Sequence, residues 1–151
     1  MLTRTWPLHS PQAVFATLLR TLGFRVSETV TRCYKNLGEN PETHPEGYKW
    51  GTFTHELLIA DWPASNGDRY IVDGAWGPWA CNAPLKLADE YVVPGLNSYE
   101  AFRLKKEQLP LSPWMPKPID SIEGYTVSRW VTPVGTKIAF PITAETPGYW
   151  T

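Results

Sequence analysis

Proline and glycine interrupt this chain so often that long helices have little room to form. Its 151 residues include 15 Pro and 11 Gly, together with 8 Trp. Proline breaks a helix interior and is confined in sheets to edges, first positions and bulges. A chain of this length can bury one substantial core. The composition therefore predicts one turn-rich, aromatic-packed unit rather than a helical bundle.

Charge and hydropathy argue against two classes of partner. The chain has 14 basic and 15 acidic residues, scattered along its length, with a formal net charge of −1. We therefore expect no nucleic-acid partner. No apolar run approaches the roughly 20 residues that a membrane-spanning helix needs, so we expect no membrane partner. Residues 1–10 lack the apolar centre of a secretory signal, and we expect a cytoplasmic location and two free thiols, Cys33 and Cys81.

The clearest local pattern predicts a helix that starts at Pro11. Ser10 is a typical N-cap, proline is favoured at the first helical position, and Gly23 is a typical C-terminal stop. The apolar residues between them recur at helical spacing: Val14, Phe15, Leu18, Leu19 and Leu22.

Alternating patterns after Gly23 predict an antiparallel sheet. We expect strands at 24–34, 52–61 and 69–73, with a hairpin turn at 63–68 that contains Asn66-Gly67-Asp68. In the first strand, Val26, Val30 and Arg32 should face the core.

The chain after Pro84 is harder to interpret. Residues 84–104 suggest short strands and turns. Nearly half of the prolines fall in 110–151, which predicts short or edge strands in a loosely packed tail. We therefore divide the chain into residues 1–109, a helix with its sheet, and residues 110–151, the tail.

His55 and Asp73 are the residues that suggest chemistry. Each lies on one of two strands predicted to be neighbours, so the imidazole and the carboxylate should meet. A carboxylate that accepts the ring N–H fixes the tautomer and stabilises the imidazolium, which suits a general base. The alternative is structural, because a strand histidine is often simply satisfied and Asp before Gly often starts a turn.

Several short motifs, in this order, resemble the arylamine N-acetyltransferase family. The resemblance covers roughly residues 12–104. Its motifs are Phe15-Ala16, Leu19-Arg20-Thr21-Leu22-Gly23-Phe24, Val30 and Arg32, Thr54-His55 with Leu57-Leu58, Val72-Asp73 with Trp76-Gly77, and Pro84-Leu85. The resemblance implies an α+β fold of the papain-like, thiol-acyltransferase type, with the N-terminal helix packed on an antiparallel, barrel-like sheet.

The same resemblance implies a site and its substrates. His55 corresponds to the catalytic histidine, Asp73 to the carboxylate that orients it, and Trp76 and Gly77 to the lining of the acceptor site. Family members transfer acetyl from acetyl-CoA through a cysteine thioester to an arylamine or hydrazine. The resemblance also leads us to expect a monomer and no metal.

The chain departs from the family at the nucleophile. The family's cysteine position falls on Leu8, within a stretch that lacks the Gly-Gly-aromatic-Cys signature. A truncated gene product and a genuine loss of the nucleophile both explain this, and either predicts a nearly inactive chain. Cys33, Cys81 and Ser10 are the replacements to consider, but Cys33 should point away from the core and Ser10 more naturally caps the helix.

Three other readings stay open. The chain can be a non-catalytic family member that binds CoA or an aromatic ligand, or a transglutaminase-like or peptidase-like protein with the same Cys, His, Asp order. It can also be an unrelated aromatic-rich β module, in which His55 and Asp73 would lie far apart. No Cys or His pair has zinc-finger spacing. Several aromatic side chains are candidates for a core or for a stacking surface: Trp50, Phe53, Trp62, Trp76 and Trp79.

Overall fold

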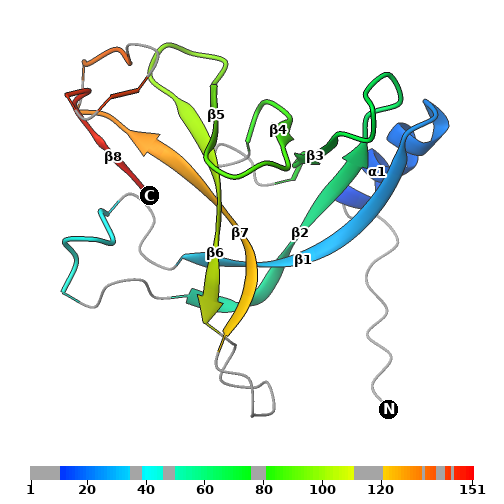
Figure 1. Cartoon of the computed structure of the whole chain (residues 1–151), viewed down its shortest axis with the longest axis horizontal. Coiled ribbons are helices and arrows are strands. Elements are labelled where there is room, and N and C mark those ends of the chain that lie inside the picture. The colour runs from blue at the N-terminus through cyan, green and yellow to red at the C-terminus, as the bar shows by residue number, and fades with distance from the viewer. Residues whose placement is uncertain are drawn as a thin grey trace.

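Two antiparallel sheets and one helix make up the part of the chain that can be described. The computed structural model describes residues 11–34, 39–45, 50–75, 81–110, 121–133, 135–138, 142–143 and 145–151. The elements are α1 (Pro11–Thr21), β1 (Arg25–Tyr34), β2 (Trp50–Asp61), β3 (Arg69–Val72), β4 (Leu85–Lys86), β5 (Tyr91–Pro94), β6 (Ala101–Pro110), β7 (Ser121–Val131) and β8 (Tyr149–Trp150). One sheet has the order β1-β2-β3-β4 and the other β5-β6-β7-β8. Figure 1 shows the long strands β6 and β7 crossing β1 and β2 steeply.

The helix ends where the sequence predicts. Gly23 has φ 90°, a conformation that glycine adopts without strain. Its N–H donates to the Arg20 carbonyl at 3.0 Å, and the N–H of Phe24 donates to the Leu19 carbonyl at 3.1 Å. This pair of bonds is the Schellman motif, which satisfies carbonyls at the end of a helix. The predicted C-terminal stop at Gly23 is therefore confirmed.

The face that the helix buries differs from the predicted stripe. Val14, Leu18 and Leu22 are each more than half exposed, whereas Gln12 and Ala16 are buried. The helix is rotated so that the Gln12 side chain reaches between β2 and the turn after β3. A buried polar side chain needs hydrogen-bond partners, and those partners lie on this side of the helix.

The first sheet follows the predicted strands and hairpin. β1 and β2 pair from Arg25↔Asp61 onwards, and β2 and β3 pair from Asp61↔Arg69 to Leu58↔Val72. The turn between β2 and β3 closes with the N–H of Trp62 donating to the Asp68 carbonyl at 3.1 Å.

The assignment of β1 residues to the core from the sequence fails at Val30 and Arg32. Val30 is 46% exposed, and the guanidinium of Arg32 lies 5.9 Å from the ring centroid of Phe53, itself an exposed residue. Thr29, on the alternate face, lies opposite Leu57, which packs against the core cluster, whereas Val26 lies opposite the buried Ala60 on its own face. Valine and arginine can occupy a partly solvated face, so β-propensity alone did not identify the buried one.

The expectation of an irregular tail is wrong for residues 121–131. They form β7, an interior strand that pairs with β6 from Phe102↔Arg129 to Pro110↔Ser121. The reason is local, since the prolines of the tail flank this segment and leave it uninterrupted. Among the described residues the sheets stay separate, so the predicted barrel does not close.

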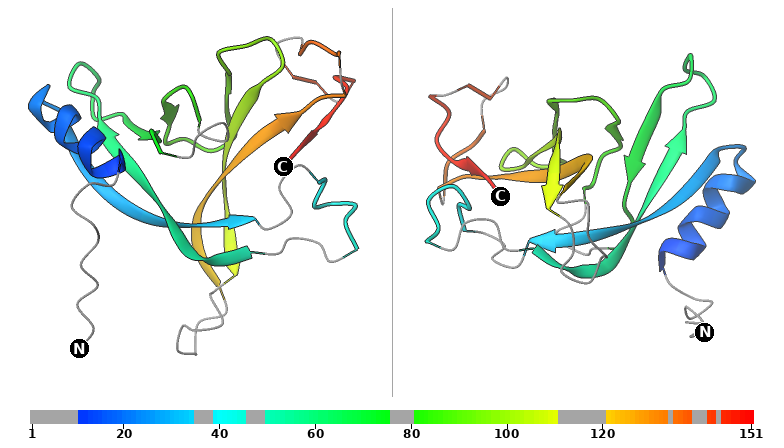
Figure 2. Two further views of the ribbon diagram at one scale, coloured as in Figure 1. Left: turned by 180° about the vertical axis from the view of Figure 1, so that it is seen from behind. Right: turned by 60° about the horizontal axis from the view of Figure 1, so that its bottom comes forward.

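The core lies where the two sheets meet. Ile71 and Leu85 come from the first sheet, and Phe102 and Leu104 from the second. Figure 2 shows the same crossing of the sheets from two other sides, with α1 at the far end of the β1–β2 pair. Burying these side chains joins both sheets into one body, which fixes the strands that carry the site.

Truncating this junction should destabilise the whole unit. Leu104 is fully buried, so Leu104→Ala should lower the free energy of unfolding by about 2–5 kcal/mol. Leu96, which is 82% exposed, supplies the matched control, because Leu96→Ala should stay within about 0.5 kcal/mol of the parent. Urea unfolding followed by tryptophan fluorescence measures both. Equal effects would contradict the position of the core.

Candidate acid–base site

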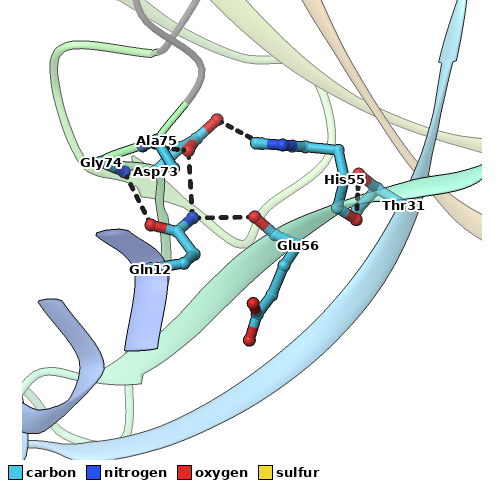
Figure 3. A network of polar contacts seen from close by, with 7 residues as sticks. All are labelled: Gln12, Thr31, His55, Glu56, Asp73, Gly74 and Ala75. Carbon is cyan, nitrogen blue, oxygen red and sulfur yellow. Dashed lines mark hydrogen bonds and ion pairs between the residues drawn. The ribbon is translucent and has the colours of Figure 1, made fainter. Parts of the chain in front are cut away.

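His55 and Asp73 meet as the strand pattern predicts. His55 lies on β2 opposite Thr31, and Asp73 follows directly after the last residue of β3. The imidazole Nε2 lies 2.8 Å from Asp73 Oδ2. Only 14% of the His55 side chain and 7% of the Asp73 side chain are exposed. The predicted contact is present, and Figure 3 shows the imidazole pointing at the carboxylate.

A bulge in β2 sits next to the histidine. Thr31 pairs with His55 and Arg32 pairs with Phe53, so Thr54 is the extra residue on β2. A bulge bends a strand and changes the direction of side chains beside it. The hydroxyl of Thr31 also donates to the His55 carbonyl at 3.2 Å, which fixes the histidine backbone to β1.

Gln12 connects the helix to this pair, and the sequence motifs did not single it out as a site residue. Its Nε2 donates to the Glu56 carbonyl at 2.8 Å and to Asp73 Oδ1 at 3.0 Å. Its Oε1 accepts the N–H of Gly74 at 3.1 Å. One buried amide thus holds the strand of His55, the carboxylate and the turn that follows it (Figure 3).

The surroundings of Asp73 favour its charged form. Burial alone would raise the pKa of this carboxyl, but hydrogen bonds from His55, the Ala75 N–H and Gln12, together with the charge on His55, lower the pKa below its usual range. The Ala75 N–H lies 3.0 Å from Asp73 Oδ1. Each of these donors stabilises a carboxylate and not a carboxylic acid.

This geometry decides which ring nitrogen can exchange protons. An ionised carboxylate only accepts hydrogen bonds, so Nε2 of His55 carries the hydrogen and donates it to Asp73. Proton transfer to a reacting group then falls to Nδ1. The carboxylate stabilises the imidazolium that results, which is the arrangement of an oriented general base.

Both thiols are held in the protonated form. Burial raises the pKa of Cys33, a hydrogen bond with the Thr54 side chain lowers it, and the charge of Asp73 raises it; the net effect is upward. Burial raises the pKa of Cys81 to about 11, and a backbone hydrogen bond with Ala83 opposes the shift only in part. Neither thiol is therefore a thiolate at neutral pH.

Cys33 lies on the face of β1 that was predicted to point away. Residues two apart share a face of a strand, so Cys33 shares a face with Thr31 and hence with His55. The effect of the Asp73 charge on Cys33 agrees with this placement. The sequence error came from assigning Arg32 to the core.

Other predicted residues lie outside the described part of the chain. Trp76 and Gly77, expected to line the acceptor site, belong to 76–80, and Leu8 and Ser10 belong to 1–10. Within the described ranges, no cluster of at least three His, Cys, Asp or Glu side chains is arranged to hold a metal ion. In those same ranges, no helix has the length and apolar character that crossing a bilayer requires.

No family model matches the chain, and comparisons with curated proteins and with solved structures give no match either. The roles of His55 and Asp73 therefore rest on their geometry and on the sequence motifs around them.

Removing the Gln12 amide should weaken both the fold and the carboxylate. Gln12→Ala leaves the Glu56 carbonyl and the Gly74 N–H, whose bonds to Gln12 are partly buried, without this partner. Each unsatisfied group costs up to about 1–3 kcal/mol. We expect a loss of about 2–4 kcal/mol in urea unfolding, and a rise in the Asp73 pKa in carbon-detected NMR titration. Thr17→Ala, which changes an exposed position of the same helix, should do neither. An unchanged Asp73 pKa in Gln12→Ala would show that the amide does not act on the carboxylate.

Acid should destabilise the fold partly through Asp73. The pKa of Asp73 is lower in the folded protein than the ordinary value of 3.8, so its contribution is fully present above that value. It is lost as the pH falls through the folded pKa. The free energy of unfolding of Asp73→Asn should therefore fall less steeply than that of the parent below about pH 4. Glu42→Gln removes an exposed carboxyl outside this network and should keep the parent's slope; an identical slope in Asp73→Asn would contradict the assignment.

Proposed function

We propose that His55 and Asp73 are the base and its orienting carboxylate in an acyl-transfer site of the arylamine N-acetyltransferase kind. The observation that carries the proposal is the 2.8 Å contact between His55 Nε2 and Asp73 Oδ2, made by two largely buried side chains. A buried, oriented histidine is the element that thiol-dependent acyl transfer requires. The helix followed by an antiparallel sheet is compatible with the papain-like, thiol-acyltransferase type of fold.

The chemistry assigned to this pair is proton transfer at Nδ1 of His55. In the family's reaction, a cysteine sulfur attacks the thioester carbonyl of acetyl-CoA and the bond from carbon to the CoA sulfur breaks. His55 would take the proton from the attacking thiol and return it to the departing CoA thiolate. In the second half the arylamine or hydrazine nitrogen would attack the acetyl carbonyl and lose its proton to His55, and the bond from the acetyl carbon to the cysteine sulfur would break, with the proton returning to that sulfur. Asp73 stabilises the imidazolium between these steps.

Leu8 limits what this chain does by itself. A leucine at the matched position cannot form a thioester, and both described thiols are protonated at neutral pH. Deleting the nucleophile from a comparable unit has cost about 10⁶-fold in rate. We therefore expect no acetylated arylamine above background from the natural sequence.

A binding role is the second candidate, and it is favoured by the same leucine at position 8. A family member that has lost its nucleophile can keep its ligand site, with Trp76 and Gly77 toward the aromatic ligand. It would bind CoA or an aromatic amine saturably, without transfer. Titration calorimetry with CoA separates this role from a residual enzyme.

Restoring a thiol at the matched position tests the acid–base role directly. Leu8→Cys should gain an acetyl group at residue 8 when mixed with acetyl-CoA, as peptide mass spectrometry would show. Adding His55→Ala to this variant should slow the acetylation by about 10²–10⁴-fold, because the general base is lost. Leu2→Cys places a thiol in the same segment away from the matched position and should acetylate slowly whether or not His55 is present.

Equal acetylation of Leu8→Cys with and without His55 would remove the acyl-transfer role from the pair. Measurable arylamine turnover by the natural sequence would contradict the predicted inactivity. Repeating the assay with Cys33→Ser and Cys81→Ser would then identify the replacement thiol.

A further inference from the structure

The outer edge of β1 presents its backbone groups to the surface. β1 is the terminal strand of its sheet, and among the described residues no strand pairs with its outer side. The Val26 carbonyl points outward, because it accepts a hydrogen bond from the Arg20 side chain at 3.0 Å. Backbone groups alternate between the two sides of a strand in an antiparallel ladder, and the extra residues at the two register shifts lie on β2, so the groups of Glu28, Val30 and Arg32 also point outward.

The pairing on the other side of β2 supports this alternation. Trp62 donates to the Asp68 carbonyl, so between His55 and Asp61 the even-numbered β2 residues face β3 and the odd-numbered ones face β1. The odd β2 residues lie opposite odd β1 residues, as in Ile59↔Ser27 and Leu57↔Thr29. The even residues of β1 are consequently the ones that face away from the sheet.

The exposed edge also carries an apolar side chain between two opposite charges. Val30 is 46% exposed, and so is the side chain of Glu28. Arg32 follows two residues after Val30 on the same face, where its Nε also donates to the Gly51 carbonyl at 2.9 Å. Edge strands of this kind are templates for pairing with another chain unless charge or shape prevents it.

We propose that this edge binds a second copy of the same chain, with β1 antiparallel to the partner's β1 and Val30 opposite the partner's Val30. The two sheets would then join into one continuous sheet across a two-fold axis. Glu28 would lie opposite the partner's Arg32, and Arg32 opposite the partner's Glu28. This replaces the monomer that the sequence led us to expect.

Charge selects this register from the others that the edge allows. Centring the pair on Glu28 puts two carboxylates directly opposite, and centring it on Arg32 does the same for two guanidinium groups; like charges directly opposite are destabilising. Centring it on Thr29 or Thr31 pairs one of these charged residues with Val30. Only the register centred on Val30 gives two opposite-charge pairs and one apolar pair.

The same register also suits the inner face. Thr29 falls opposite the partner's Thr31, and Thr–Thr pairs are favourable across antiparallel strands. Arg20 ends the new ladder before Val26, because its side chain already donates to the outward carbonyl of Val26. The same side chain pairs with Glu28 at 2.9 Å. The new ladder is therefore centred between Glu28 and Arg32.

A second copy fits the edge better than an unrelated extended peptide. Any extended chain can bond to exposed backbone groups, but the order Glu28, Val30, Arg32 is complementary to its own antiparallel copy. The joined strands are short, which places the interface at the low end of protein–protein areas. The dimer should be reversible, with a dissociation constant of about 10⁻⁵–10⁻⁴ M.

Sedimentation over a concentration series tests the surface. The parent chain should shift from monomer to dimer across the micromolar range, and Val30→Lys should remain monomeric because it puts two ammonium groups face to face on the axis. Ile122→Lys, at an exposed position of β7, makes the same change on the other sheet and should leave the dimer intact. A parent that stays monomeric at about 10⁻³ M, ten times the upper value expected here, would overturn the proposal. A dimer that survives Val30→Lys would overturn it as well.

Mixing two charge variants tests the register. Glu28→Lys and Arg32→Glu should each abolish self-association, because each places like charges opposite one another on both sides of the axis. Their equimolar mixture should form a heterodimer, since both cross-strand pairs are then of opposite charge. Circular dichroism confirms that each variant is folded, and Val30→Lys tests the surface independently if Arg32→Glu is not. A mixture that stays monomeric would overturn the register.

Discussion

The carbonyl of Glu56 is the group on which the arrangement of the site depends. β3 ends at Val72, opposite Leu58, so the next carbonyl of β2 that faces this side has no strand to pair with. A buried carbonyl without a donor is costly, and the Gln12 amide supplies that donor. Because the same amide also bonds Asp73 and Gly74, closing the end of the sheet also places the carboxylate beside His55. The start of the helix, the middle of β2 and the turn after β3 thus form one unit.

This unit has consequences for any nucleophile. The donors around Asp73 keep it charged, and that charge disfavours a second anion nearby. The Asp73 charge raises the pKa of both described thiols, Cys33 and Cys81. A thiolate is therefore more favourable on the Nδ1 side of the imidazole, away from the carboxylate. In the proposed function, Leu8 takes the nucleophile position, so the proposed site would keep its base and lack its reactive group.

The sequence predicted short-range features better than long-range ones. The Gly23 stop, the turn before Arg69 and the contact between His55 and Asp73 follow from local turn chemistry and strand alternation, and all are present. The buried side of α1 was not predictable, because Gln12 is held by groups distant in sequence. Val30 was wrongly assigned to the core, since valine suits a half-exposed strand face as well as a core. β7 was not predicted, because the expectation rested on the number of prolines in the whole tail, and residues 121–131 contain none.

The edge of β1 and the site are physically connected through one residue. Thr31 lies opposite His55 and its hydroxyl donates to the His55 carbonyl. Thr31 is flanked by Val30 and Arg32, whose outward backbone groups would pair with a second chain. A strand hydrogen-bonded on one side moves more freely than one bonded on both. Adding a strand would therefore restrict β1 at the point where it holds the histidine backbone, so the proposed self-association would be coupled through the sheet to the geometry of the acid–base pair.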